Sequence, residues 1–142
     1  MTKYSQEELE QEIKRLYPSP DFKVMTTALI QALAYLPRQD VDKLLNKSVI
    51  YIQGNISRRF DREEIRGSSI IILNIADLKD EKLSIITILH ESAHEILNHI
   101  ETHIPEEYYQ QEAEAWNKVR EWLPKEFHES INAYEKEAQP KK

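Results

Sequence analysis

The chain has 142 residues, enough for one domain with a single hydrophobic core. Hydrophobic residues make up 40% of it and charged residues 31%, a balance typical of a globular chain rather than a disordered one. The formal net charge of -6 argues against nonspecific binding to nucleic acid or anionic lipid as the main activity. Cysteine is absent. This excludes disulfides and thiol catalysis, and it leaves histidine, carboxylate and water as metal ligands.

The first residues, MTKYSQEELEQEIKRLY, are polar and acidic and contain no apolar signal core. No stretch of the sequence is apolar for long enough to span a membrane. We therefore expect a cytoplasmic protein that has neither a membrane nor a nucleic acid as a direct partner.

The N-terminal third is expected to be helical. Leu9, Ile13 and Leu16 recur at helical spacing within residues 5 to 17, and Ser5 followed by glutamates is a helix-start signal. The sequence PSP at 18 to 20 ends this helix. A second, apolar helix is expected over 21 to 36, and one or two further turns over 40 to 45.

The middle of the chain has the composition of β-strands. SVIYIQG at 48 to 54 is rich in β-branched and aromatic residues and closes on a glycine. SSIIILNI at 68 to 75 is an unbroken apolar run, consistent with a strand buried on both faces. The polar stretch between them is interpreted as an edge strand or a hairpin arm.

Helical spacing returns after the strands. One helix is expected from residue 80 to 102 and another over about 106 to 123, stopped by Pro124. The last residues, 125 to 142, favour a short helix with a frayed tail. The order of elements predicts an α+β fold in which a small sheet precedes two helices.

The helix over 80 to 102 contains HESAH at 90 to 94. His90 and His94 stand one turn apart, so both imidazoles leave the same face and can reach one zinc ion. Glu91 points about 100° around the helix, where it can reach a water held at that position. This is the arrangement of H-E-x-x-H sites, with two ligands and a general base on one turn.

The alternative is that these are ordinary core or surface histidines. Ile86, Ala93 and Leu97 lie on or beside the same face, which indicates that the face is buried. Two unpaired buried histidines would be costly there, and a metal ion removes that cost. The metal site is therefore the preferred interpretation.

A catalytic zinc site needs a third protein ligand, and the following helix offers two glutamates. Glu112 lies on its apolar face, four residues from both Tyr108 and Trp116. Glu114 lies among polar residues on the solvated face. A carboxylate on an apolar face needs a partner, so Glu112 is the expected ligand and Glu114 the alternative. A hydrogen bond to a tyrosine or a backbone amide would also explain Glu112.

His99 and His103 form a second pair with a spacing of four. Near the end of a helix, histidines are often exposed and interact favourably with the helix dipole. We interpret His99 as a residue that supports a ligand or lies on the surface. The metzincin pattern is excluded, because it requires glycine and histidine where the chain has Leu97 and Ile100.

Taken together, SSIIILN, IITILHESAHEILNH, EAEAW and the closing WLP resemble the ImmA/IrrE-type zinc metallopeptidases over roughly residues 48 to 124. The chain departs from the family pattern at Ala93 and Trp116, where glycine and asparagine are common. The resemblance implies a zincin-like fold, with zinc on His90, His94 and the first glutamate of EAEAW, Glu112.

The resemblance further implies that Glu91 is the catalytic base in a single metallopeptidase-like domain over 1 to 142. Its core would be 48 to 124, preceded by helices within 5 to 47 and followed by a tail over 125 to 142. The expected substrate is a peptide bond in a protein or peptide partner, and several members of the family cleave repressors of mobile elements or stress regulons. No helix-turn-helix reader is evident in the sequence.

Three further points stay open from the sequence. Candidates for a second oxyanion donor are Tyr108, Tyr109 and His99. A non-catalytic interaction module with the same fold and a structural zinc is the rival function, and its fourth ligand would be a residue such as His99 or His128. Hydrolysis of a non-peptide amide is a third possibility.

Overall fold

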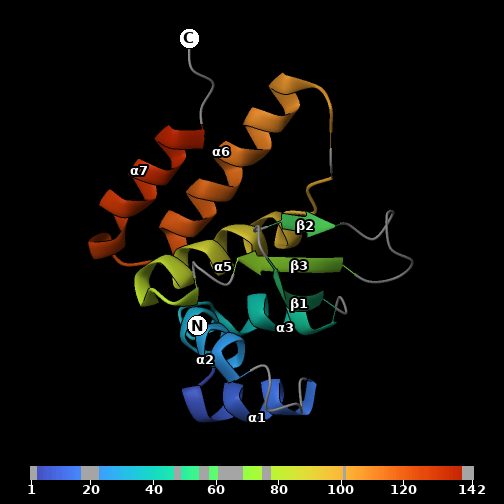
Figure 1. The fold of residues 1–142 in the computed structure, drawn as a ribbon, viewed down its shortest axis with the longest axis vertical. Coiled ribbons are helices and arrows are strands. Elements are labelled where there is room, and N and C mark those ends of the chain that lie inside the picture. Colours follow the sequence, from blue (N-terminus) through green and yellow to red (C-terminus); the bar gives the residue numbers. More distant parts are fainter. Residues whose placement is uncertain are drawn as a thin grey trace.

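The computed structural model describes residues 3–16, 23–46, 49–54, 58–60, 69–74, 78–100 and 102–138 (Figure 1). The elements in these ranges are α1 (Gln6–Leu16), α2 (Lys23–Leu33), α3 (Arg38–Asn46), β1 (Val49–Gly54), β2 (Arg58–Phe60), β3 (Ser69–Asn74), α5 (Glu81–Ile96), α6 (Pro105–Trp122), the 3₁₀ turn η2 (Lys125–Phe127) and α7 (His128–Ala138). Among the described helices, none is both long and apolar enough to cross a bilayer.

The described part of the chain is mainly helical, so the expected α+β, zincin-like fold class is wrong. Six α-helices account for most of it, whereas the strands are three to six residues long. Among the described side chains of the core, the strands contribute Tyr51, Ile71 and Leu73, and the others come from helices and the turns beside them. The core formed by the described side chains is therefore built chiefly by helices packing on helices.

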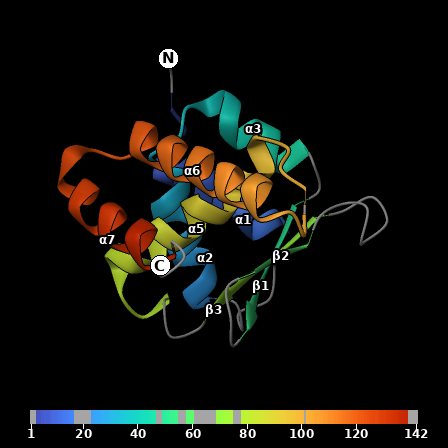
Figure 2. The ribbon, with the colours of Figure 1, turned by 90° about the horizontal axis from the view of Figure 1, so that it is seen from above.

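The three short strands lie at one side of the helices (Figure 2), and they pair in the order β1-β3-β2. β1 pairs with β3 in parallel, with Val49 opposite Ser69, and β2 pairs with β3 antiparallel, with Arg58 opposite Ile72. The strands expected at 48–54 and 68–75 are confirmed, except for residues 48, 68 and 75, which lie outside the described residues. The stretch between them supplies an edge strand at 58–60, and residues 55–57 and 61–67 also lie outside.

The start of α1 agrees with its sequence signal. The Ser5 hydroxyl accepts from the backbone N–H of Glu8 at 3.1 Å, and the Glu8 carboxylate accepts from the backbone N–H of Ser5 at 3.1 Å. This reciprocal pair satisfies two N–H groups that the first turn leaves without helical partners. α2 ends at Leu33 rather than at residue 36, and α3 is longer than the expected turn over 40–45.

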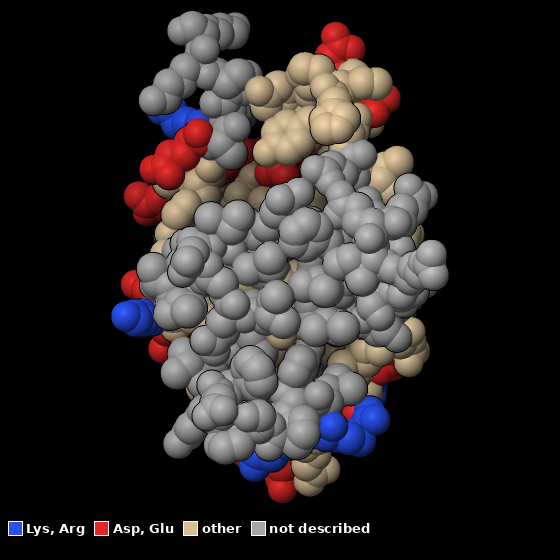
Figure 3. Space-filling view, turned by 45° about the vertical axis from the view of Figure 1, so that its right-hand side comes forward, with Lys and Arg blue, Asp and Glu red and all other residues tan. Residues whose placement is uncertain are grey.

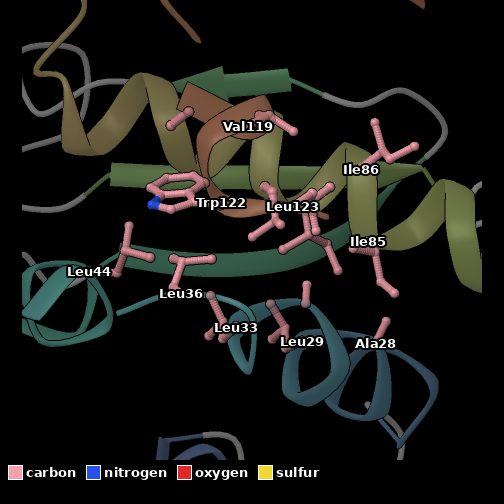
Figure 4. Close-up of a cluster of buried hydrophobic side chains, with 14 of the residues drawn as sticks. Ala28, Leu29, Leu33, Leu36, Leu44, Ile85, Ile86, Val119, Trp122 and Leu123 are labelled. Atoms are coloured by element: carbon pink, nitrogen blue, oxygen red, sulfur yellow. The ribbon is translucent and has the colours of Figure 1, made fainter. Parts of the chain in front are cut away.

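α5 is the central helix of the fold. It packs against α2 on one side and α6 on the other, and it also contacts α3 and β3 (Figures 1 and 2). Figure 4 shows apolar side chains from α2, α5 and α6 meeting in one cluster, with Leu29, Ile86 and Val119 among them. Helices α3 and α6 are tied by a buried hydrogen bond in which the Trp122 indole donates to Asp40 at 3.0 Å.

α5 ends at Ile96, so the helix expected to run to residue 102 is shorter than predicted. Asn98 adopts a left-handed backbone conformation with φ 58°. Its N–H donates to the Glu95 carbonyl at 3.2 Å, and the N–H of His99 donates to the His94 carbonyl at 3.0 Å. These two bonds form a Schellman motif, which closes the helix and turns the chain back over its last turn.

Candidate metal centre

His90 and His94 lie one turn apart on α5, on the side that faces α6. Their side chains are 15% and 11% exposed, and their ring centroids are 4.8 Å apart. Ala93 is buried, as the apolar pattern predicted, whereas Leu97 is 36% exposed because the helix has already ended. The histidines thus sit in a largely desolvated position.

Glu112 is the carboxylate that α6 brings to these histidines. Its Oε2 lies 3.1 Å from Nε2 of His90, and its Oε1 lies 2.8 Å from Nε2 of His94. One ligand atom from each residue lies within 4.8 Å of the others. The structure therefore brings together the three side chains that the sequence suggested as metal ligands.

The negative charge of Glu112 and the positive charge of His90 stabilise each other. Burial would raise the pKa of Glu112, but hydrogen bonds from His90 and His94 and their positive charges outweigh it and hold the pKa well below its usual range. Burial likewise opposes a charge on His90. The hydrogen bond to Glu112 and the negative charges of Glu91, Glu112 and Glu135 prevail and raise its pKa.

Glu91 lies beside the cluster. Its side chain is 13% exposed, and its Oε1 is 3.7 Å from Nδ1 of His90. A carboxylate in this position is adjacent to the ligand cluster without being part of it. The placement is compatible with a base that acts on a water molecule next to the ligands.

Tyr108 is 46% exposed, yet it is within electrostatic reach of the cluster. Partial burial, followed by the negative charges of Glu112 and Glu91, raises the pKa of its phenol. Tyr109 is 38% exposed and packs edge-on against Tyr108 at 5.3 Å. The phenol of Tyr108, a candidate oxyanion donor, is thus influenced by the carboxylates of both Glu112 and Glu91.

The sequence alone did not predict that His99 and Glu114 lie next to each other beside His94. His99 is buried, and its Nδ1 lies 2.8 Å from Nδ1 of His94. Glu114 is 47% exposed, as expected for the solvated face, and its Oε1 lies 3.5 Å from Nε2 of His99. Glu114 therefore faces the histidine behind His94 instead of the ligand cluster. The signal for this arrangement was Asn98, a residue type that tolerates the left-handed conformation.

Trp116 is a neighbour of the site whose role the sequence did not reveal. Its ring stacks on His90 with centroids 4.0 Å apart and planes 8° from parallel. Trp116 is 5% exposed, and within the described part of the chain its indole N–H is buried without a hydrogen-bond partner. The i, i+4 spacing from Glu112 placed it on the right face, but the stacking depends on how α5 and α6 pack.

The donor set fits a zinc ion. Two imidazole nitrogens and one carboxylate oxygen are the ligands of His₂Glu catalytic zinc sites, and ligands at ~2.0–2.2 Å from a tetrahedral zinc are ~3.3–3.5 Å apart. The observed separations of 2.8 and 3.1 Å join the histidines to different oxygens of Glu112, and one ligand atom from each residue lies within 4.8 Å of the others. The three side chains would therefore have to draw together to hold one ion. The second nitrogen of His94 also has a partner, as metal-bound histidines usually do.

Comparison with family models, with curated proteins and with solved structures finds no match to this chain.

Proposed function

We propose that this protein is a zinc metallopeptidase in which His90, His94 and Glu112 hold the metal and Glu91 is the general base. The observation that carries the proposal is the convergence of two Nε2 atoms from α5 on the two carboxylate oxygens of Glu112, at 3.1 and 2.8 Å. The resemblance of HESAH and EAEAW to ImmA/IrrE-type peptidases supports the same roles. The proposal rests on the site and not on the fold class.

The residues of the site suit peptide hydrolysis. A zinc ion held by the three ligands would supply a Lewis acid and lower the pKa of a water ligand towards ~7. Glu91 accepts a proton from the attacking water as its oxygen bonds to the carbonyl carbon. When the carbon–nitrogen bond breaks, Glu91 returns that proton to the departing amine. The phenol of Tyr108, which lies within electrostatic reach of Glu112 and Glu91, donates a hydrogen bond to the oxyanion.

A peptide is the proposed substrate because exposed apolar side chains lie on the connection from α5 to α6 and at the beginning of α6, between the two helices that carry the site. All large hydrophobic side chains that are exposed in the described part of the chain fall between residues 97 and 109: Leu97, Ile100, Ile104, Tyr108 and Tyr109. We call this set the apolar rim. Figure 3 shows a group of residues other than Lys, Arg, Asp and Glu at the upper right of the molecule, with acidic atoms at its outer edge and in the recess below it. Exposed apolar groups next to a polar centre are typical of binding sites.

Among the described residues β2 pairs with β3 alone, so the other side of this strand offers a second means of holding an extended peptide through main-chain hydrogen bonds. The cytoplasm is the proposed compartment. By the same resemblance, a transcriptional repressor or a regulator of stress or mobile elements is the proposed kind of substrate protein.

The rival function is an interaction module with a structural zinc, which would need a fourth protein ligand. His99 is engaged with Nδ1 of His94. Nε2 of His128 donates to the backbone carbonyls of Arg120 and Leu123, both at 3.1 Å. Among the described residues, the group that could hold a metal ion consists of His90, His94 and Glu112, with no fourth protein ligand. This favours the catalytic proposal.

The test combines zinc content with hydrolysis. Elemental mass spectrometry should find about one zinc per chain in the wild type and in Glu114→Ala, and less in His94→Ala and Glu112→Ala. A randomised peptide library, with products read by mass spectrometry, should be cleaved by the zinc-loaded wild type. Glu91→Gln should keep the zinc and lose at least ~10²-fold in rate. A wild type that binds no zinc after supplementation refutes the proposal. Zinc binding without any cleavage would instead favour the interaction module.

A further inference from the structure

A line of hydrogen-bonding groups leads outward from the candidate metal centre on the side opposite Glu112. Nε2 of His94 faces Glu112 at 2.8 Å, and Nδ1 of the same ring lies 2.8 Å from Nδ1 of His99. On the far side of His99, Nε2 lies 3.5 Å from the carboxylate of Glu114. The order of groups is therefore ligand position, His94, His99, Glu114 and solvent.

The position of the hydrogen on each imidazole ring explains why the groups follow one another in this order. A neutral histidine that binds a metal through Nε2 carries its hydrogen on Nδ1, and that N–H needs an acceptor. The acceptor beside Nδ1 of His94 is Nδ1 of His99. When Nδ1 of His99 accepts, the hydrogen of that second ring is on Nε2, where it points to Glu114. Each hydrogen-bond donor in the line then faces an acceptor.

We propose that His99 is a positioning residue, which with Glu114 holds His94 in the tautomer and ring orientation that bind zinc through Nε2. This inference rests on the metal centre of the proposed function. The end of α5 makes the contact possible, because the Schellman motif at Asn98 brings residue 99 back against residue 94. In that motif the corresponding two side chains usually make an apolar contact. Here both are histidines, and their nitrogens are within hydrogen-bonding distance.

The alternative is that His99 merely fills space at the end of the helix, and two variants separate these roles. His99→Leu keeps the apolar contact and removes the acceptor. His99→Asn retains an oxygen near the position of Nδ1 and loses most of the ring. If His99 positions His94, zinc should bind ~10–100-fold more weakly to His99→Leu than to the wild type. His99→Asn should stay within a few-fold of the wild type. A space-filling role predicts the opposite order.

The measurement is the zinc dissociation constant of the full chain, by competition with a fluorescent chelator, together with thermal unfolding of each metal-free variant. Glu114→Ala provides a variant whose exposed position leaves folding intact. Because Glu114 is not a ligand, this variant should still bind one zinc per chain at saturating metal, with a loss of affinity smaller than that of His99→Leu. Equal zinc affinity in wild type and folded His99→Leu overturns the inference. Equal affinity in wild type and Glu114→Ala overturns the part of the inference that assigns Glu114 a role in holding His99 and His94. A wild type that binds no zinc refutes the metal centre itself, so the two failures are distinguishable.

Discussion

Trp116 lies flat on the imidazole of His90, with ring centroids 4.0 Å apart and planes 8° from parallel. This contact connects a fluorescent side chain of α6 directly to a proposed zinc ligand of α5. Charge placed on the imidazole changes the environment of the stacked indole. The contact therefore supplies a spectroscopic reporter for the metal centre.

Addition of zinc to the metal-free protein is expected to change its tryptophan fluorescence, and Trp116→Phe should abolish that change. Trp122 stays in both proteins and serves as the internal control, because its indole bonds to Asp40 away from the cluster. Fluorescence titration with zinc measures the effect. A response that persists in Trp116→Phe would show that the signal does not come from the stacked pair.

The stability of the metal-free protein should depend on pH through the same cluster. Glu112 has a lowered pKa, so its contribution is present above its ordinary pKa of about 4.5 and is lost as pH falls. His90 has a raised pKa, so its contribution is complete below its ordinary pKa of about 6.5 and is lost as pH rises through the raised value. Both contributions are therefore present between these two values.

We expect the free energy of unfolding, measured in urea with a chelator present, to fall by about 1–3 kcal/mol between pH 6 and pH 9. Glu112→Gln should weaken this dependence, because one of the carboxylates that raise the pKa of His90 has been removed. With zinc present the trend should reverse, since metal binding competes with protons. The same slope in Glu112→Gln and the wild type would contradict the assignment.

The end of α5 should be sensitive to the residue at position 98. Asn98 has φ 58°, a conformation that glycine adopts freely and that costs alanine about 1–2 kcal/mol. Asn98→Ala should therefore lower the free energy of unfolding by about that amount, whereas Asn98→Gly should leave it nearly unchanged. Urea unfolding of the three proteins measures this. Equal stability of the alanine and glycine variants would argue against the Schellman motif.

The apolar rim should contribute to substrate binding rather than to folding. Ile100 and Ile104 are 55% and 51% exposed, so the double change to serine should alter the free energy of unfolding by less than about 0.5 kcal/mol per site. Binding of apolar peptides to zinc-loaded Glu91→Gln protein should weaken about tenfold when both side chains are removed. Fluorescence anisotropy with labelled library peptides measures this. Unchanged binding would exclude these side chains from the peptide site.

Much of the candidate site follows from local sequence. The spacing of His90 and His94 determines that they share a helix face, because an α-helix repeats every 3.6 residues. The same periodicity separates Glu112 from Glu114, and the structure indeed places the first against both histidines and leaves the second 47% exposed. The reciprocal cap at Ser5 and the strands could likewise be predicted from the sequence, because the residues that indicate each of them lie within a few positions of one another.

The tertiary structure decided how large a share of the core the helices form. It also decided where α5 ends and which groups surround the histidines. Asparagine permits a left-handed turn at position 98 but does not impose it. The sequence alone therefore predicted a helix that runs to residue 102, and it left open whether His99 supports a ligand or lies on the surface. The contact of Trp116 with His90 depends on the packing of α6 against α5, which no local spacing specifies. Periodicity assigns a side chain to a face of its own helix, whereas the partner it meets there depends on how separate elements pack.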